Sequence, residues 1–164
     1  MQRIKSFVLG MLVLFALWVA IAGTDRDELV AGFLIALLIS WIFRRNFELL
    51  GELRLNPQAL LRIPVYLALF LRELVKSSLD VARRVLSPSL PINPGIVKVR
   101  TKLQSKLGRI ILANSITLTP GTMTVETRGE YLYIHWIDTQ CEDVEAATRS
   151  IVHCFEQHLE VIFG

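Results

Sequence analysis

The stretch FVLGMLVLFALWVAIAG, residues 7–23, contains 17 residues without a charged side chain. A helix of this length covers about 25 Å, slightly less than the bilayer core of about 30 Å. Arg3 and Lys5 precede the stretch and are long enough to reach the headgroup region. The stretch therefore predicts a membrane-spanning helix, and it decides the broad class of the fold.

A second uncharged stretch, LVAGFLIALLISWIF, follows at residues 29–43. The five residues between the two stretches, 24–28, suffice for a tight antiparallel hairpin. We expect two transmembrane helices, at about residues 7–23 and 29–45, in a first region that covers residues 1–47. Lys and Arg flank the outer ends of both, with Arg44 and Arg45 as juxtamembrane residues. The positive-inside rule places the N-terminus and the chain after residue 44 in the cytoplasm.

The first stretch also resembles a signal peptide, because a basic start and an apolar run precede Ala20-Ile21-Ala22. The second apolar stretch follows at once and favours the hairpin. Neither stretch contains an ionisable side chain, whereas a proton or cation path through a membrane fold usually does. We therefore interpret the two helices as anchors and packing surfaces.

Residues 57–86 have the pattern of a long amphipathic helix. Polar residues recur three, four or seven positions apart on a background of Leu, Val, Ile, Phe and Ala: Arg62, Tyr66, Glu73, Lys76, Asp80, Arg83 and Arg84. We expect this helix to lie on or partly in the membrane surface, with Arg83 and Arg84 at the interface. Burial against a membrane subunit would suit it too. A third span is the alternative, and it conflicts with the charge distribution.

The stretch SPSLPINPG, residues 87–95, contains three of the six prolines and predicts a stiff linker that ends a second region, 48–95. Residues 96–164 then predict a β-α-β-β-α order. It comprises a strand at 96–101, a helix at 102–117, and a hairpin of strands at 122–127 and 131–137. Thr139 and Glu142 form a capping box before one helix. That helix has an apolar face made of Val144, Ala147, Ile151, Phe155, Leu159 and Ile162.

The predicted fold class is thus a membrane α-helical hairpin plus a long amphipathic helix, followed by a small cytoplasmic α/β (β-α-β-β-α) domain. We expect a right-handed crossover between the first two strands, with both helices on one face. The uncharged stretch LANSITLTPGT, residues 112–122, predicts the end of a helix buried on two sides and the turn into the central strand. One side would contact the sheet, and the other the membrane face or another protein.

Composition excludes several functional classes. The net charge is +3, but residues 96–164 contain seven basic and eight acidic side chains, so no concentrated basic face is available for nucleic acid. Two cysteines are too few for a disulfide scaffold. No nucleophile-elbow, Walker or C-x-x-C motif occurs. His153 and His158, five residues apart, would lie on different helix faces, so we predict no metal, no cofactor and no enzymatic activity.

Three stretches carry a resemblance to a known family: DVARRVLSPSLPINPGIVKV (80–99), ILANSITLTPGTMTVE (111–126) and LYIHWID (132–138). In this order and spacing they resemble the E subunit of the multisubunit monovalent cation/proton antiporters called Mrp, Mnh or Sha. The resemblance covers nearly the whole chain.

The resemblance implies a bacterial inner-membrane complex that exchanges external protons for internal Na⁺, or in some members Li⁺ or K⁺. In that family large subunits similar to those of respiratory complex I carry the ions, and the E subunit is a small accessory component. Other subunits and the lipid bilayer are the implied partners, with no small-molecule substrate bound by this chain alone. The alternative function is a membrane-anchored cytoplasmic adaptor or interaction domain outside an antiporter. The family motif maps onto Asn114, Thr117, Thr119, Pro120, Gly121 and Thr122, which we interpret as structural and interface residues.

Overall fold

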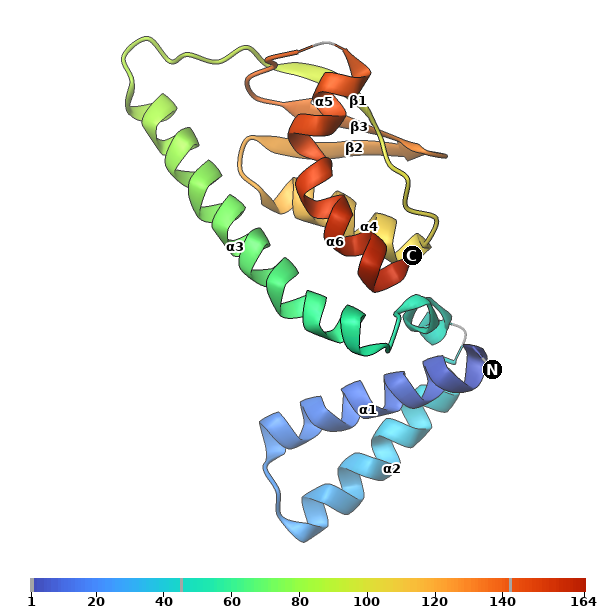
Figure 1. The fold of residues 1–164 in the computed structure, drawn as a ribbon. Coiled ribbons are helices and arrows are strands. Elements are labelled where there is room, and N and C mark those ends of the chain that lie inside the picture. The colour runs from blue at the N-terminus through green and yellow to red at the C-terminus, as the bar shows by residue number, and fades with distance from the viewer. Residues whose placement is uncertain (1, 45, 142) are drawn as a thin grey trace. The chain divides into compact units, whose positions relative to one another are not determined.

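The computed structural model describes residues 2–44, 46–141 and 143–164. The chain forms two compact units, Met1–Leu53 and Arg54–Gly164 (Figure 1).

The first unit is a helical hairpin followed by a short 3-10 helix. It comprises α1 (Gln2–Ala22), α2 (Arg26–Ile42) and η1 (Asn46–Glu52). Gly32 on α2 permits close contact, because the Trp18 indole occupies the space that a Cβ at position 32 would need. Within the described residues, Ile4–Ala22 is the one helical segment with the length and composition of a membrane span. No pattern in the sequence predicts η1.

The second unit begins with α3 (Pro57–Leu86), which spans the range that the polar spacing predicts. Asn56 caps it by accepting a hydrogen bond from the Ala59 amide at 2.9 Å. The remaining elements are β1 (Gly95–Arg100), α4 (Lys106–Leu118), β2 (Thr122–Arg128), β3 (Tyr131–Trp136), α5 (Val144–Ile151) and α6 (His153–Phe163).

The three strands form one antiparallel sheet in the order β1-β3-β2. The expectation that the second strand is central is wrong. The turn at Gly129, with φ +58°, folds β3 back onto β2, and β1 then pairs with the free edge of β3, where Val97 lies opposite Ile134. The crossover through α4 therefore joins two edge strands instead of two neighbours.

One face of the sheet forms the core. Val97 and Val99 of β1 and Leu132 and Ile134 of β3 are buried, as alternation along each strand requires. The helices supply the opposing apolar side chains, which are Leu112, Ile116, Ala147, Ile151, Phe155 and Leu159. The opposite face is open, and Ile96 there is 65% exposed.

The C-terminal segment is two helices where the sequence predicts one. Val152 ends α5 and precedes α6, so that α5 contacts β1 whereas α6 contacts α3 and α4. The predicted capping box does not start α5. Asp143 is the cap, and its side chain accepts a hydrogen bond from the Ala146 amide at 3.0 Å. Glu142 lies outside the described residues.

Candidate interface at the α4–β2 corner

The motif threonines close the corner between α4 and β2 with local hydrogen bonds. Thr119 donates its hydroxyl to the Ser115 carbonyl at 2.7 Å, and Thr122 donates to the Ile116 carbonyl at 2.7 Å. Thr117 donates to the Ala113 carbonyl at 2.9 Å and accepts from the Thr124 amide at 3.1 Å. These hydroxyls satisfy helix-end carbonyls and one strand amide without adding charge.

Gly121 is required by both conformation and space. Its φ is +91°, a region that residues with a Cβ rarely adopt. A Cβ there would come within 3.0 Å of Ile137 Cγ2, and the Gly121 carbonyl accepts from the Ile137 amide at 2.9 Å. Together with the half-buried Pro120, Gly121 sets the direction in which the chain enters β2.

One face of α4 remains exposed. It consists of Ile110, Asn114, Thr117 and Leu118, which recur at i, i+4, i+7 and i+8. We call these four residues the α4 face. The Asn114 side chain is exposed and forms no hydrogen bond to any described residue. Of the six motif residues, it is the one whose exposed polar side chain remains available to a partner. The motif therefore separates into a structural part and an exposed part.

The second buried side of α4 contacts elements of the same chain. Ser115 lies there, and its hydroxyl is hydrogen-bonded to the hydroxyl of Tyr66 on α3. The Tyr66 ring packs edge-on against Phe155 of α6, with centroids 6.4 Å apart. Burial raises the pKa of Tyr66 above its ordinary value of 10.0. The expectation that a membrane face or another protein covers this side is therefore wrong.

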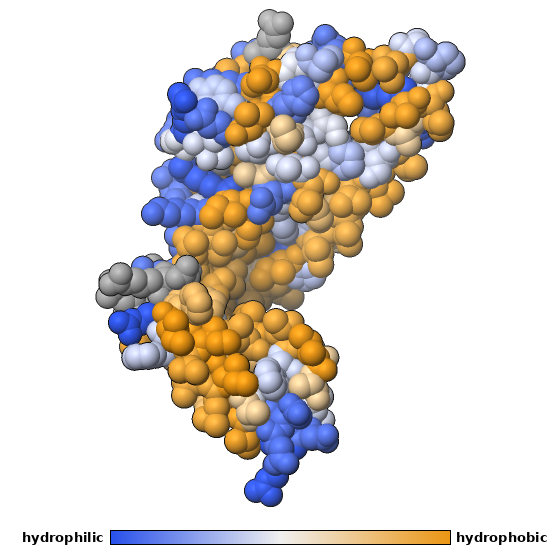
Figure 2. All heavy atoms as spheres, turned by 180° about the vertical axis from the view of Figure 1, so that it is seen from behind, coloured by the Kyte–Doolittle hydropathy of each residue, from blue (hydrophilic) through white to orange (hydrophobic). Residues whose placement is uncertain are grey.

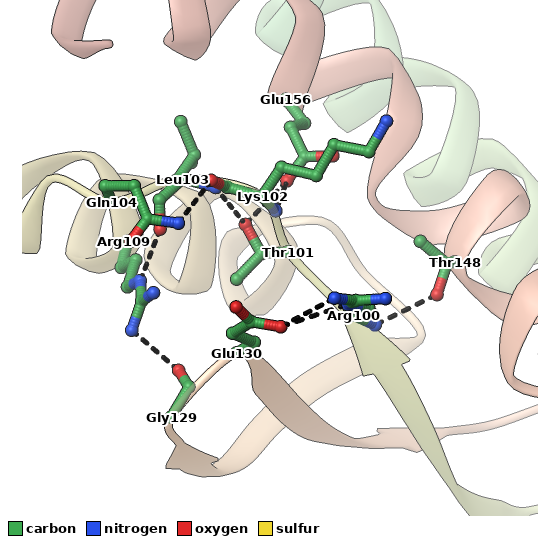
Figure 3. A network of polar contacts seen from close by, with 10 residues as sticks. All are labelled: Arg100, Thr101, Lys102, Leu103, Gln104, Arg109, Gly129, Glu130, Thr148 and Glu156. Carbon is green, nitrogen blue, oxygen red and sulfur yellow. Dashed lines mark hydrogen bonds and ion pairs between the residues drawn. The ribbon is translucent and has the colours of Figure 1, made fainter.

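A cavity of about 420 Å³ lies beside Asn114. Arg109 is its one charged lining residue, and the guanidinium is fixed by two carbonyls: Nε donates to Leu103 at 2.5 Å and Nη1 to Gly129 at 2.6 Å (Figure 3). The guanidinium thereby joins the start of α4 to the β2–β3 turn.

A buried carboxylate in the same network was missed by sequence reasoning. Glu156 on α6 is 6% exposed, and its Oε1 accepts from the Thr101 hydroxyl at 2.6 Å and the Lys102 amide at 2.7 Å (Figure 3). The interaction joins the end of β1 to α6. The sequence offered one indication of this burial, because Glu156 lies beside the apolar positions 155 and 159 of the predicted helix face.

The arginines predicted to lie at the membrane have different environments. Arg44 is exposed and stacks over Trp41, 5.8 Å from the ring centroid, and Arg83 is exposed. Arg84 is mostly covered and pairs with Asp80 at 2.7 Å and Asp138 at 2.9 Å, which ties the end of α3 to the segment after β3. Arg45 lies outside the described residues.

Within the described part of the chain, no three His, Cys, Asp or Glu side chains form a cluster that could hold a metal ion. Both cysteines are free. Burial and the nearby Glu73 carboxylate raise the pKa of the Cys154 thiol, which disfavours the reactive thiolate.

The comparison with known families decides the identity of the chain. A family model described as "Na+/H+ ion antiporter subunit" matches residues 11–162, and so includes both units. The chain belongs to this family of Na⁺/H⁺ antiporter subunits. Members of the family are subunits of multisubunit membrane transporters and not enzymes, so this chain is membrane-associated and has other subunits as partners.

Named relatives agree with the antiporter-subunit family. The E subunit of the Na⁺/H⁺ antiporter of Alkalihalophilus pseudofirmus is 32% identical over 149 residues, which cover 89% of this chain and 90% of the relative. Its namesake in Bacillus subtilis is 33% identical over 135 residues, covering 81% and 82%. The resemblance found in the three sequence stretches is thereby confirmed.

A solved structure matches the fold of nearly the whole chain. A chain in the membrane-bound sulfane sulfur reductase, an archaeal respiratory membrane complex, has a TM-score of 0.86 and 40% identity. The match covers 96% of this chain and 99% of that chain. Members of this structural group therefore occur in more than one kind of membrane complex.

Proposed function

We propose that this antiporter subunit is an accessory component that supports assembly and stability of its complex and does not carry the ion path. The observation that carries the proposal is the absence of ionisable side chains from residues 7–23 and 29–43. A path for Na⁺ or H⁺ through these helices would need such groups or a chain of polar ones. The chain would need no cofactor, small-molecule substrate or nucleic acid for this role.

The α1–α2 hairpin is proposed to anchor the chain as two spans in a bacterial inner membrane. Its outward side chains are apolar, including the exposed residues Leu12, Leu17, Phe33, Leu38 and Trp41, as contact with lipid or neighbouring spans requires. The acidic loop at 24–28 and the basic residues at the opposite ends favour a cytoplasmic N-terminus and a cytoplasmic second unit.

The α4 face is proposed to contact a neighbouring subunit. Ile110 is 47% and Leu118 60% exposed, and the uncommitted amide of Asn114 lies between them on the helix. Two apolar side chains around a polar group that can still form hydrogen bonds suit a small docking patch. Thr119, Thr122 and Gly121 would act indirectly, because they hold α4 at its angle to β2.

Native gel electrophoresis of mildly solubilised membranes tests the assembly role. Deletion of this subunit is expected to remove the large band, and the wild-type chain to restore it. Ile110→Asp should fail to restore the band, whereas Ile96→Asp, a matched change on the open sheet face, should succeed. A large band of unchanged intensity without the chain would show that the complex does not need this subunit for assembly.

A second candidate role is membership in a respiratory membrane complex instead of an antiporter. The observation in its favour is sequence identity. This chain is 40% identical to the sulfane sulfur reductase chain over 96% of its length, but 32% identical to the Alkalihalophilus pseudofirmus antiporter subunit over 89% of its length. Mass spectrometry of the purified native complex separates the two roles. Co-purifying reductase polypeptides would support the respiratory role, and antiporter subunits without them would exclude it.

A further inference from the structure

Helix α3 presents three different surfaces along its length. The inward one faces the α/β part of the second unit and contains Ala59, Tyr66, Glu73 and Arg84, which are buried or half-buried. Tyr66 bonds to Ser115 of α4, and Arg84 pairs with Asp138. Several polar residues that mark the amphipathic pattern therefore point into the protein and not toward water.

The outward surface of α3 is an apolar stripe. At 100° per residue, six large exposed apolar side chains share one side of the helix between positions 60 and 86, and they are Leu60, Leu67, Leu71, Val75, Val85 and Leu86. The one hydroxyl in this line, Ser78, donates back to the Leu74 carbonyl at 2.6 Å and so adds no free polar group. Figure 2 shows this apolar surface running along the helix.

The third surface contains three basic side chains, with the exposed Leu79 among them. Arg72, Lys76 and Arg83 are four and seven residues apart and share one flank of the helix beside the apolar stripe. The Arg72 and Lys76 side chains are more than 70% exposed, and each reaches Glu73 only at 3.8 Å or more. Across α3 five basic side chains accompany two acidic ones, so the flank has positive charge available for a partner.

We propose that the apolar stripe and basic flank of α3 bind the anionic-lipid surface of the bilayer, with the helix lying in the headgroup plane. The proposal deepens the proposed function, on which it rests, because the hairpin must first bring the chain to the membrane. The stripe enters the boundary between headgroups and acyl chains, and the flank contacts lipid phosphates.

Charge complementarity favours lipid over a protein partner. A protein surface that buried this stripe would leave the adjacent Arg and Lys at its solvated rim, where their charge would contribute little to binding. An anionic leaflet supplies negative charge along the whole helix, which is about 45 Å long for 30 residues. The inward surface then holds the α/β part against the side of α3 that faces away from the acyl chains.

Spin-label depth measurement in nanodiscs tests the inference on the full chain in its purified complex. Cys141→Ser and Cys154→Ser remove the native thiols, and Leu71→Cys places one label on the stripe. Glu145→Cys on α5, whose native side chain is 85% exposed, is the water-exposed control. Accessibility to oxygen and to a water-soluble nickel chelate is compared in phosphatidylcholine alone and in phosphatidylcholine mixed with phosphatidylglycerol.

The Leu71→Cys label is expected to shift toward oxygen and away from nickel when phosphatidylglycerol is added, and the Glu145→Cys label to stay nickel-accessible in both. Replacing Arg72, Lys76 and Arg83 together by Gln should remove the shift. The matched triple change of Lys102, Lys106 and Arg149 to Gln should leave it unchanged. A label shielded from both reagents would mean that protein covers the stripe, and that result would overturn the inference.

The native gel keeps this inference separate from the assembly role. If the accessibility of the Leu71→Cys label does not depend on lipid composition while the complex is fully assembled, lipid binding is overturned and the assembly role is not. Loss of the lipid shift in the α3 triple variant, with the large band retained, supports lipid binding as an activity distinct from subunit docking.

Discussion

The hydroxyl of Tyr66 on α3 is hydrogen-bonded to the hydroxyl of Ser115 on α4. The two residues are 49 positions apart and join the long helix to the helix that precedes the motif corner. Ser115 also donates to its own Ile111 carbonyl at 2.8 Å. The tyrosine thus extends a polar chain from α4 to α3.

Tyr66→Phe should lower the free energy of unfolding by about 1 kcal/mol, because it removes one partly buried hydrogen bond and leaves the ring in place. Chemical denaturation of the full chain in detergent measures the change. Tyr133→Phe is the control, since the described residues offer its hydroxyl no hydrogen bond. Equal effects of the two changes would refute a specific role for the Tyr66 bond.

Gly121→Val should destabilise the second unit and reduce the amount of assembled complex. The change forces a β-branched residue into a positive φ and brings its Cβ within 3.0 Å of Ile137, for which we expect a cost of roughly 2 kcal/mol or more. Gly129→Val is the matched control, because φ there is also positive but no atom lies within 4 Å. The prediction fails if both variants unfold at the same denaturant concentration.

Glu156→Ala should cost about 1–3 kcal/mol, because the Thr101 hydroxyl and the Lys102 amide lose their common acceptor inside the unit. Glu156→Gln keeps an acceptor oxygen and should recover much of the loss. Glu160→Ala, one turn further along α6, controls for helix propensity. Thermal unfolding ranks the three variants by stability. A Glu156→Gln variant as unstable as Glu156→Ala would show that the negative charge itself is needed.

His158 should make the second unit less stable in acid. Burial, and secondly the charge of Arg62, lower the pKa of His158 below 6.5. The folded state therefore binds the proton more weakly than the unfolded state, so the associated stability is present above pH 6.5 and is lost as pH falls through the lowered folded-state pKa. The free energy of unfolding, measured by chemical denaturation, should decrease less between pH 7 and pH 5 in His158→Gln than in the wild type. The exposed-site control His153→Gln should show the wild-type decrease.

Most elements of the second unit were predictable because their signals are local. The spacing of polar residues located α3, and alternation together with the Arg128–Glu130 turn located β2 and β3. The break at Val152 was not predictable, since neither Gly nor Pro marks it. The central position of β3 also depends on long-range pairing, which no local pattern encodes.

The candidate site was only partly predictable for a similar reason. The uncharged stretch 112–122 located the corner, but composition could not separate Asn114, which is exposed, from Thr119 and Thr122, which bond to the backbone. The direction of each side chain depends on how α4 packs against α3 and the sheet. Likewise Arg83 and Arg84 are adjacent in sequence, and the contact of Arg84 with Asp138 distinguishes this half-buried pair from the exposed Arg83.

The most direct test of the accessory role is cation/proton exchange in membrane vesicles, normalised to the amount of assembled complex on a native gel. Ile110→Asp and Gly121→Val should lower total Na⁺/H⁺ exchange in proportion to the loss of complex, with the exchange rate per complex and the Na⁺-over-K⁺ preference unchanged. A variant that leaves the complex fully assembled but changes the cation preference would contradict the account and place this subunit in the ion path.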